Sequence, residues 1–436
     1  MRLLALLLGM TACTSGDLDP GRAVACRECG PGAVTAGRFV HDEYRSDVIA
    51  ANHLGQMVRA AKGGLAWLDG SLRPALSVPL DGAYSELEPA RIAIADDGEV
   101  VLIGHEWDDF NPNPELREIA ADGHQRWRIP TGVSSEPDQI AIGPSLVFLG
   151  PGRSPAPYKL PGHVLTGNFI VALDRATGAL VWEVPLPLTT SVYGTPIHLA
   201  AMPDGGVAVS GEFTGELALG GTAATLTAPP AARAAGYVAA LDAAGRGRWV
   251  IELDPGDAES HVADSNLGAL ASAPGGEVAV IGTWDGAAAM FGGVPLAHVY
   301  EGSNPVGQMI ALIAPGGGVT WAHPFGRRSD SITSLVTDGV EVIAAGSRDT
   351  AVSFDVDRTE PVGSDGYFVS TDTAQRWFRA ARGNGYQDVT VHALTADGVL
   401  ASVHSWTTED DTLDPTLTIG DVHADGPGFL IAKLAR

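Results

Sequence analysis

The sequence predicts an all-β fold, a β-propeller, and three observations lead to this expectation. The 436 residues include 55 Gly and 29 Pro, which favours many short strands joined by turns over long helices. A strand pattern that ends in Trp recurs along the chain, and a second strand pattern lies between its copies. The final residues repeat the first pattern without its Trp, so we expect the amino terminus to complete the last unit.

The repeated Trp pattern alternates apolar residues into a Leu-Asp or related turn and then reaches a Trp. Its clearest copies read GNFIVALDRATGALVW and GYVAALDAAGRGRW. The Trp residues of the five copies are Trp127, Trp182, Trp249, Trp321 and Trp377. The intervals between them are 55, 67, 72 and 56 residues, enough for the four short strands of one propeller blade. We expect these Trp residues to be buried structural positions between neighbouring blades.

The number of copies predicts the number of blades. The apolar part of the Trp pattern, before its turn, is the expected third strand of each blade. Seven copies of it centre on Leu68, Ile119, Leu173, Leu241, Ile313, Thr371 and Lys433. We therefore expect seven four-stranded blades, with six or eight as the alternatives. The last copy, GFLIAKLAR at residues 428–436, has no following strand, and RFVHDEY at residues 38–44 can supply it. Pairing of the amino- and carboxy-terminal strands would close the ring and hide its sheet edges.

The amino terminus, MRLLALLLGMTACTSG, reads as an export signal. A single Arg precedes a short apolar run that is too short to span a bilayer. The segment that ends in Cys13 resembles the lipobox of bacterial lipoproteins, in which that Cys is acylated and anchors the protein. The alternative is an ordinary secretory signal with Cys13 unmodified. We expect a signal peptide at 1–12, a lipidated flexible tether at 13–37 and the propeller at 38–436.

The resemblance to lipoproteins also bears on location. Thr14 follows Cys13, where an Asp would mark retention at the inner membrane of Gram-negative bacteria. The resemblance therefore implies the outer membrane or the cell surface. Cys26 and Cys29 lie in the tether as C-x-x-C, where a local disulfide or two idle thiols fit an oxidising compartment. A redox motif or half of a zinc site fits less well, because neither a βαβ pattern nor a second ligand pair follows.

The charge balance limits the partners. The formal net charge is −25, which repels phosphate backbones, so we expect no nucleic-acid partner. Acidic loops offer the only metal candidates, among them a D-x-D at Asp355 and Asp357 and a cluster that contains Asp410 and Asp411. Hard oxygen ligands suit calcium, yet neither stretch completes a spaced calcium loop. We expect solvated charge at both, and no cofactor beyond calcium.

The repeats resemble known propeller families. VALDRATGALVWEVPL and VAALDAAGRGRW are similar to quinoprotein-type repeats, and MFGGVPL around Gly292 resembles an element of large bacterial surface propellers. The resemblance implies a fold and not a chemistry. Quinoprotein dehydrogenases place an adjacent Cys pair over their cofactor, and this chain has no such pair. None of the common local motifs of hydrolases, metalloproteases or nucleotide-binding proteins is present either.

These observations favour a binding protein. We expect a membrane-tethered, non-enzymatic propeller lipoprotein that acts as a binding or scaffolding module at the cell envelope, monomeric, with a protein or carbohydrate partner. Its ligand is not specified by the sequence. The alternative is a propeller enzyme, a hydrolase or lyase, with its site at the mouth of the central channel, where titratable side chains would have to converge.

Overall fold

The computed structural model of this chain consists of strands, turns and loops in the part that it describes. The described residues are 16–17, 24–25, 34–41, 48–80, 87–108, 111–131, 139–150, 158–186, 197–228, 232–256, 263–285, 288–297, 306–325, 330–348, 365–371, 378–382, 386–406, 416–419, 422–425 and 428–435. Within these ranges no helix is long and apolar enough to cross a membrane.

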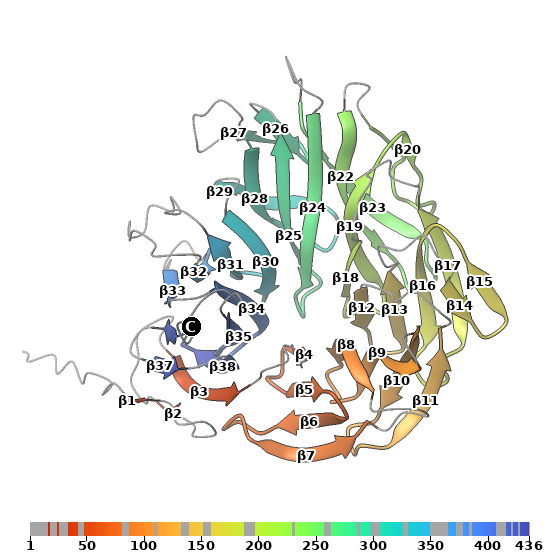
Figure 1. Cartoon of the computed structure of the whole chain (residues 1–436). Coiled ribbons are helices and arrows are strands. Elements are labelled where there is room, and N and C mark those ends of the chain that lie inside the picture. Colours follow the sequence, from red (N-terminus) through yellow and green to blue (C-terminus); the bar gives the residue numbers. More distant parts are fainter. Residues whose placement is uncertain are drawn as a thin grey trace, which may run out of the picture.

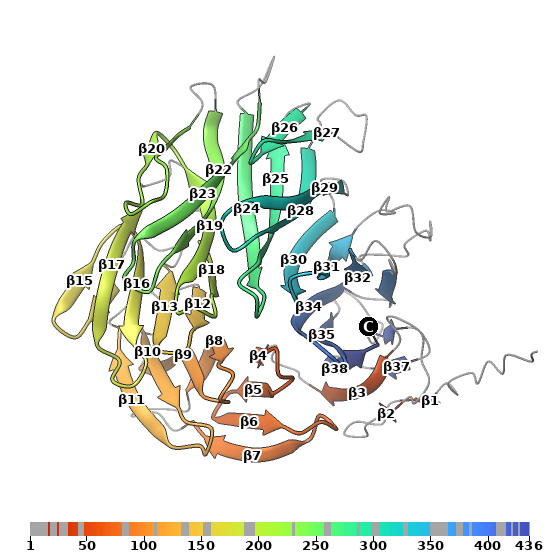
Figure 2. The same ribbon diagram turned by 180° about the vertical axis from the view of Figure 1, so that it is seen from behind.

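Seven four-stranded antiparallel blades surround a central channel (Figure 1), as the sequence predicts. Figure 2 shows the same ring from behind. From the innermost strand outwards, blade 1 is β4 (Val48–Ala51), β5 (Met57–Ala61), β6 (Gly64–Leu68) and β7 (Pro74–Pro79). Blade 2 is β8 (Glu88–Ile94), β9 (Val100–Asp108), β10 (Asn111–Ile119) and β11 (Gln125–Pro130). Blade 3 is β12 (Gln139–Ile142), β13 (Leu146–Gly150), β16 (Asn168–Asp174) and β17 (Leu180–Leu186).

The remaining blades follow the same order. Blade 4 is β18 (His198–Ala201), β19 (Val207–Phe213), β22 (Ala232–Leu241) and β23 (Gly247–Asp254). Blade 5 is β24 (Ala263–Ser272), β25 (Val278–Asp285), β28 (Val306–Ile313) and β29 (Val319–Phe325). Blade 6 is β30 (Asp330–Thr337), β31 (Val342–Arg348), β32 (Asp365–Ser370) and β33 (Phe378–Arg382). Blade 7 is β34 (Tyr386–Thr395), β35 (Gly398–Trp406), β38 (Gly428–Leu434) and β3 (Val34–His41).

Blade 7 closes the ring. Its third strand, β38, pairs with β35 on one side and with β3 on the other, and Phe39 lies opposite Leu430. The first and last parts of the chain therefore lie side by side in Figure 1, which confirms the expected closure. β3 begins at Val34, ahead of residue 38 where we expected the propeller to begin. Two shorter strands precede it: β1 (Gly16–Asp17) pairs with β37, and β2 (Val24–Ala25) pairs with β3.

Among the described residues, hairpins are inserted between the second and third strands of four blades. They are β14 (Tyr158–Leu160) with β15 (His163–Leu165), β20 (Glu216–Leu217) with β21 (Leu226–Thr227), β26 (Ala288–Phe291) with β27 (Val294–Ala297), and β36 (Thr416–Ile419) with β37 (Val422–Asp425). β26 pairs with β23 and β36 with β33. In these two cases the hairpin of one blade covers the outer edge of the preceding blade, which protects that edge from pairing with other chains.

Each blade is buried on both faces. In β19 of blade 4, Val207 and Val209 pack in a cluster with blade 3, while Ala208 between them packs in a cluster with blade 5. Alternate side chains of a strand point to opposite faces of the sheet. A strand buried on both faces therefore reads as a continuous run of small and branched apolar residues, as the second strands of this chain do.

Candidate functional site

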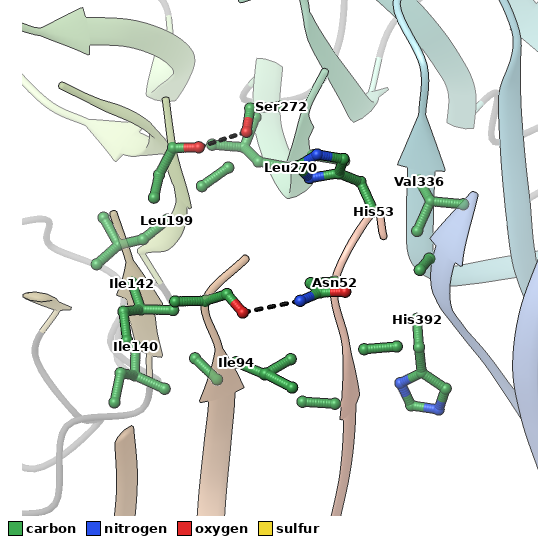
Figure 3. Close-up of a pocket in the computed structure, with 18 of the residues that line it drawn as sticks. Asn52, His53, Ile94, Ile140, Ile142, Leu199, Leu270, Ser272, Val336 and His392 are labelled. Atoms are coloured by element: carbon green, nitrogen blue, oxygen red, sulfur yellow. Dashed lines mark hydrogen bonds between the residues drawn. The ribbon is translucent and has the colours of Figure 1, made fainter. Parts of the chain in front are cut away.

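The innermost strands of all seven blades enclose a central cavity of about 780 Å³ (Figure 3). Residues of β4, β8, β12, β18, β24, β30 and β34 line it, together with the turns that follow them. Ligand pockets typically have volumes of about 300–1,000 Å³. The cavity therefore has the size of a site for a small organic ligand.

The strand pairings align the innermost strands in layers, which we name after the residue of blade 4 in each. The Leu199 layer is aliphatic in six blades, with Ile49, Ile92, Ile140, Leu199, Leu270 and Leu335. The next layer, the Ala200 layer, holds Ala50, Ala93, Ala141, Ala200, Ala271, Val336 and Ala393. Blade 7 departs from the pattern through a register shift at His392. The channel wall is therefore small or aliphatic in these two layers.

Some polar groups in this wall are already satisfied within the protein. Asn52 donates from Nδ2 to the backbone carbonyl of Ala95 at 2.7 Å, and Ser272 donates to the carbonyl of Ala201; Figure 3 shows both bonds. His392 lies 2.8 Å from the hydroxyl of Ser402 through Nε2. Burial, with a contribution from His404, lowers the pKa of His392 to about 3. This imidazole is therefore neutral at physiological pH.

A third layer, the His198 layer, lies at the end of the channel where the innermost strands begin. Arg91, Gln139 and His198 occupy it in blades 2, 3 and 4, and all three line the cavity. Burial lowers the pKa of His198 to about 4, so its imidazole is neutral and offers one donor and one acceptor. This end of the channel therefore combines one cation with two neutral polar groups.

The opposite end, where the innermost strands turn into the second strands, carries the carboxylates. We call it the turn end. His53 Nδ1 lies 2.8 Å from Asp96 Oδ1. Asp97 accepts a bond of 2.6 Å from Arg175 Nη2, through Oδ2. Both acidic side chains at the turn end are therefore engaged by basic groups of the protein.

Arg175 belongs to a larger group of charges between blades 2 and 3. This group, the Arg175 cluster, consists of Asp97, Glu99, Glu118, Arg126 and Arg175. Both arginines contact Glu99. Glu118 is fully buried, 3.4 Å from Arg175 Nε and 4.0 Å from Arg126 Nη1. Within the described residues neither oxygen of Glu118 has a hydrogen-bond partner. Burial, followed by the negative charge of Glu99, raises the pKa of Glu118 to about 7.

The predicted Trp residues lie at one position of successive blades. Trp127, Trp182 and Trp249 are on the outer strands of blades 2, 3 and 4. Each donates its indole N–H to the following blade, to the carbonyls of Arg175, Ala243 and Pro315, at 2.8, 3.0 and 3.0 Å. Trp127 and Trp249 are buried, whereas Trp182 is half-buried.

The other predicted residues divide into two groups. Trp321 lies on β29 and packs against the cluster between blades 5 and 6. The remaining ones lie outside the described residues: Cys13, Cys26, Cys29, Asp355, Asp357, Trp377, Asp410 and Asp411. Within the described ranges, no group of three or more His, Cys, Asp or Glu side chains is arranged to hold a metal ion.

Sequence reasoning missed the channel residues. Their signal is an Ile-Ala or Leu-Ala pair a few residues before five of the second-strand copies, at residues 49–50, 92–93, 140–141, 199–200 and 270–271. The pair is too short to stand out before the strand order is known. It becomes informative once the second and third strands fix the boundaries of the repeat.

Comparisons with known proteins find similar solved structures but no related family or curated protein. No protein-family model matches the chain, and no curated protein matches its sequence. Similar solved structures include hydrazine synthase of Kuenenia stuttgartiensis, with 14% identity, a TM-score of 0.43 and coverage of 71% of this chain and 77% of that one. BamB of Moraxella catarrhalis has 13% identity, a TM-score of 0.42 and coverage of 91% and 100%. A europium-containing methanol dehydrogenase has 10% identity, a TM-score of 0.37 and coverage of 91% and 93%. The function must therefore be argued from the residues of this chain.

Proposed function

We propose that this chain is a lipid-anchored binding propeller of the bacterial envelope and that its ligand occupies the central channel. The observation that carries the proposal is the cavity of about 780 Å³, lined by all seven blades. Its wall is small and aliphatic in the Leu199 and Ala200 layers, with polar and charged groups at both ends. Binding sites for small molecules likewise combine apolar wall residues with polar groups that orient the ligand.

The state of the titratable groups supports binding over catalysis. His198 and His392 are held neutral, because burial lowers the pKa of each. Asp96 and Asp97 at the turn end are engaged by His53 and Arg175. A hydrolase or lyase would need an acid and a base that converge on one reacting atom with pKa values near the working pH. The groups that line this channel are better suited to holding a ligand.

Export and anchoring are proposed from the lipobox-like segment that ends at Cys13. Cys13 lies three residues before β1, which pairs with β37 beside blade 6. Three residues span at most about 10 Å of extended chain. An acyl group on Cys13 would therefore hold the rim of the propeller near blade 6 at the membrane and leave the channel free to take up ligand.

The channel is tested with N-phenyl-1-naphthylamine, a neutral apolar dye whose fluorescence rises when it leaves water. The full chain should bind it at one saturable site. Ala93→Trp, in the Ala200 layer, should fill the channel and remove the site, while Ala176→Trp on an exposed turn should bind the dye as the wild type does. The melting temperatures of both variants are compared to exclude unfolding. Equal binding by both variants would place the dye outside the channel and refute the proposal.

The anchor is tested by fractionation. Cys13→Ala should move the protein from the membrane pellet to the soluble fraction, because the acyl chains are its only proposed contact with the bilayer. Cys26→Ala serves as the matched control and should still pellet. A Cys13→Ala protein that still pellets after a high-salt wash would show that the anchor lies elsewhere.

A further inference from the structure

The Arg175 cluster reaches from the interior of the protein to the wall of the channel. Two of its members, Asp97 and Arg175, line the cavity at the turn end. Glu118, fully buried between blades 2 and 3, is not among the described residues that line it. The cluster contains three carboxyl groups and two guanidinium groups. It is therefore electrically neutral only when one of the carboxyl groups carries a proton.

Glu118 is the member best placed to carry that proton. Both guanidinium groups bind Glu99, and that of Arg175 also binds Asp97 at 2.6 Å. Glu118 receives no hydrogen bond from the described residues. Burial, followed by the negative charge of Glu99, favours its neutral form and raises its pKa to about 7. The cluster is therefore neutral below this pH and carries one negative charge above it.

A donor and an acceptor that face each other connect Glu118 to the channel wall. Nε of Arg175 is buried without a hydrogen-bond partner among the described residues, and it lies 3.4 Å from Oε1 of Glu118, which also has none. When Glu118 loses its proton, we expect this charge-assisted hydrogen bond to form. The same guanidinium binds Asp97 through Nη2 and faces the carbonyls of Gly143 and Pro144 through Nη1, at 3.4 and 3.2 Å. A stronger bond to Glu118 would therefore leave Asp97 less compensated at the channel wall.

We propose that the protonation state of Glu118 sets whether the channel accepts anionic ligands: the turn end admits them while Glu118 is protonated and repels them once it is ionised. The inference rests on the proposed function in one respect, namely that ligands enter the channel. Salt screens buried and partly buried charges much less than exposed ones, so one added charge in the cluster acts on a ligand in the cavity. A neutral ligand should be indifferent to this charge.

Other titratable groups line the cavity and have to be separated from Glu118. His53 pairs with Asp96 at the turn end, and histidines in general can change their charge near neutral pH. Glu118→Gln retains this pair, so any contribution of His53 occurs in both proteins and cancels in their comparison. His198 and His392 are neutral at pH 6 to 8, because burial lowers the pKa of each, to about 4 and about 3.

The test compares two dyes that share one skeleton and differ in charge. N-phenyl-1-naphthylamine is neutral, and 8-anilinonaphthalene-1-sulfonate is the same molecule with an ionised sulfonate group. Both are titrated into the full chain at pH 6, 7 and 8, and the binding that Ala93→Trp removes is taken as the channel component. The affinity for the sulfonate should fall about three- to tenfold between pH 6 and pH 8 relative to that for the neutral dye. This is the effect of one unit charge about 10–20 Å away at an effective dielectric constant of about 20.

Two variants assign the response to the cluster, and a third serves as control. Glu118→Gln mimics the protonated carboxyl group, so it should bind the sulfonate at pH 8 as the parent does at pH 6. Asp97→Asn removes the carboxylate at the channel wall and should bind the sulfonate more tightly at pH 8, with a smaller response to pH. Glu252→Gln should keep the parental response. Burial also raises the pKa of Glu252 to about 7, but Glu252 is not among the described residues that line the cavity.

Several outcomes would overturn the inference while the proposed function stands. They are a sulfonate affinity that does not fall relative to that of the neutral dye, the full parental fall in Glu118→Gln or in Asp97→Asn, and exclusion of the sulfonate from the channel at pH 6 as well as at pH 8. In each of these cases the neutral dye still binds in the channel. Dye binding that Ala93→Trp leaves intact would instead refute the proposed function itself.

Discussion

The contact between blades 2 and 3 and the contact between blades 4 and 5 share one interaction in different surroundings. In each, a Trp indole donates a hydrogen bond to a backbone carbonyl of the next blade, and we call this interaction the hook. Trp127 donates to the carbonyl of Arg175 at 2.8 Å, and Trp249 donates to that of Pro315 at 3.0 Å. Both rings lie against a glycine of the turn that they contact. The first contact is surrounded by five charged side chains, whereas an apolar cluster surrounds the second. The hook acts through the backbone, so the side chain at the accepting residue is free to add a charge network.

The turn glycines explain why this hook tolerates different neighbours. Gly178 and Gly317 have φ angles of 71° and 87°, a backbone region that residues other than glycine rarely adopt. A Cβ on Gly317 would lie 2.5 Å from Cγ of Trp249, and one on Gly178 would lie 3.1 Å from Cδ2 of Trp127. The indole therefore needs a bare backbone beneath it and makes no demand on the side chain two or three residues away.

The largest expected effect comes from opening the ring, which strains all of these contacts together. Deletion of residues 428–436 removes β38 and leaves β35 and β3 as exposed edges, since β38 pairs with both. We expect the yield of soluble protein to collapse, measured by expression and sedimentation. Removal of Arg436 alone is the control and should have no effect. A truncated protein that melts as the full chain does would refute closure through β38.

Removal of a single hook should have the next largest effect. Trp127→Ala and Trp249→Ala should each lower the free energy of unfolding by about 3–5 kcal/mol, the usual range for a buried Trp. Trp182→Ala should lower it by less, because Trp182 is half-buried. Urea unfolding of the three variants measures these losses in the free energy of unfolding and ranks them. A small effect at Trp249 beside a large one at Trp127 would show that the charge network, and not the backbone hook, stabilises the first contact.

Replacement of the residue whose carbonyl accepts the hydrogen bond separates the stability due to the hook from the stability due to its surroundings. Arg175→Ala keeps the carbonyl but leaves Glu99 and Glu118 with Arg126 alone. We expect a loss of about 2–3 kcal/mol, below the 3–5 kcal/mol for a buried pair that loses its only partner. Pro315→Ala keeps the carbonyl and removes no charge, so its effect should stay within about 1 kcal/mol. Equal effects of the two substitutions would indicate that the Arg175 cluster contributes no stability of its own.

These contacts show how far sequence reasoning reaches. The recurrence of Leu-Asp, turn and Trp predicted the blades, their number and the closure near Phe39, because each depends on local patterns that repeat. The Arg175 cluster could not be predicted in this way. Glu99, Glu118 and Arg175 come from a turn, a third strand and a turn of the next blade, and no repeat relates them. The His198 layer of the channel was missed for the same reason, since Arg91, Gln139 and His198 share a position but not a residue type.

A further comparison concerns the pH dependence of stability in two blades. In the Arg175 cluster, burial and then Glu99 raise the pKa of Glu118 to about 7, while Arg126 and Arg175 oppose the shift. In blade 4, burial and then Asp254 raise the pKa of Glu252 to about 7. In the unfolded chain a glutamate loses its proton near pH 4.3. Between that value and pH 7 the folded protein therefore holds protons that the unfolded chain has released.

The sign of the pH dependence follows from this difference in bound protons. Where the folded state binds more protons, the free energy of unfolding falls as the pH rises, by about 1.4 kcal/mol per pH unit for each group. The fall should begin near pH 4.3 and end near pH 7, where the folded carboxyl also ionises.

Glu118→Gln should remove one component of this slope and Glu252→Gln the other. Because the two residues lie in separate blades, the double variant should lose both components additively. Urea unfolding at pH 5, 6, 7 and 8 measures the slopes, and a Glu118→Gln protein with the full wild-type slope would show that Glu118 is ionised throughout and paired within the cluster.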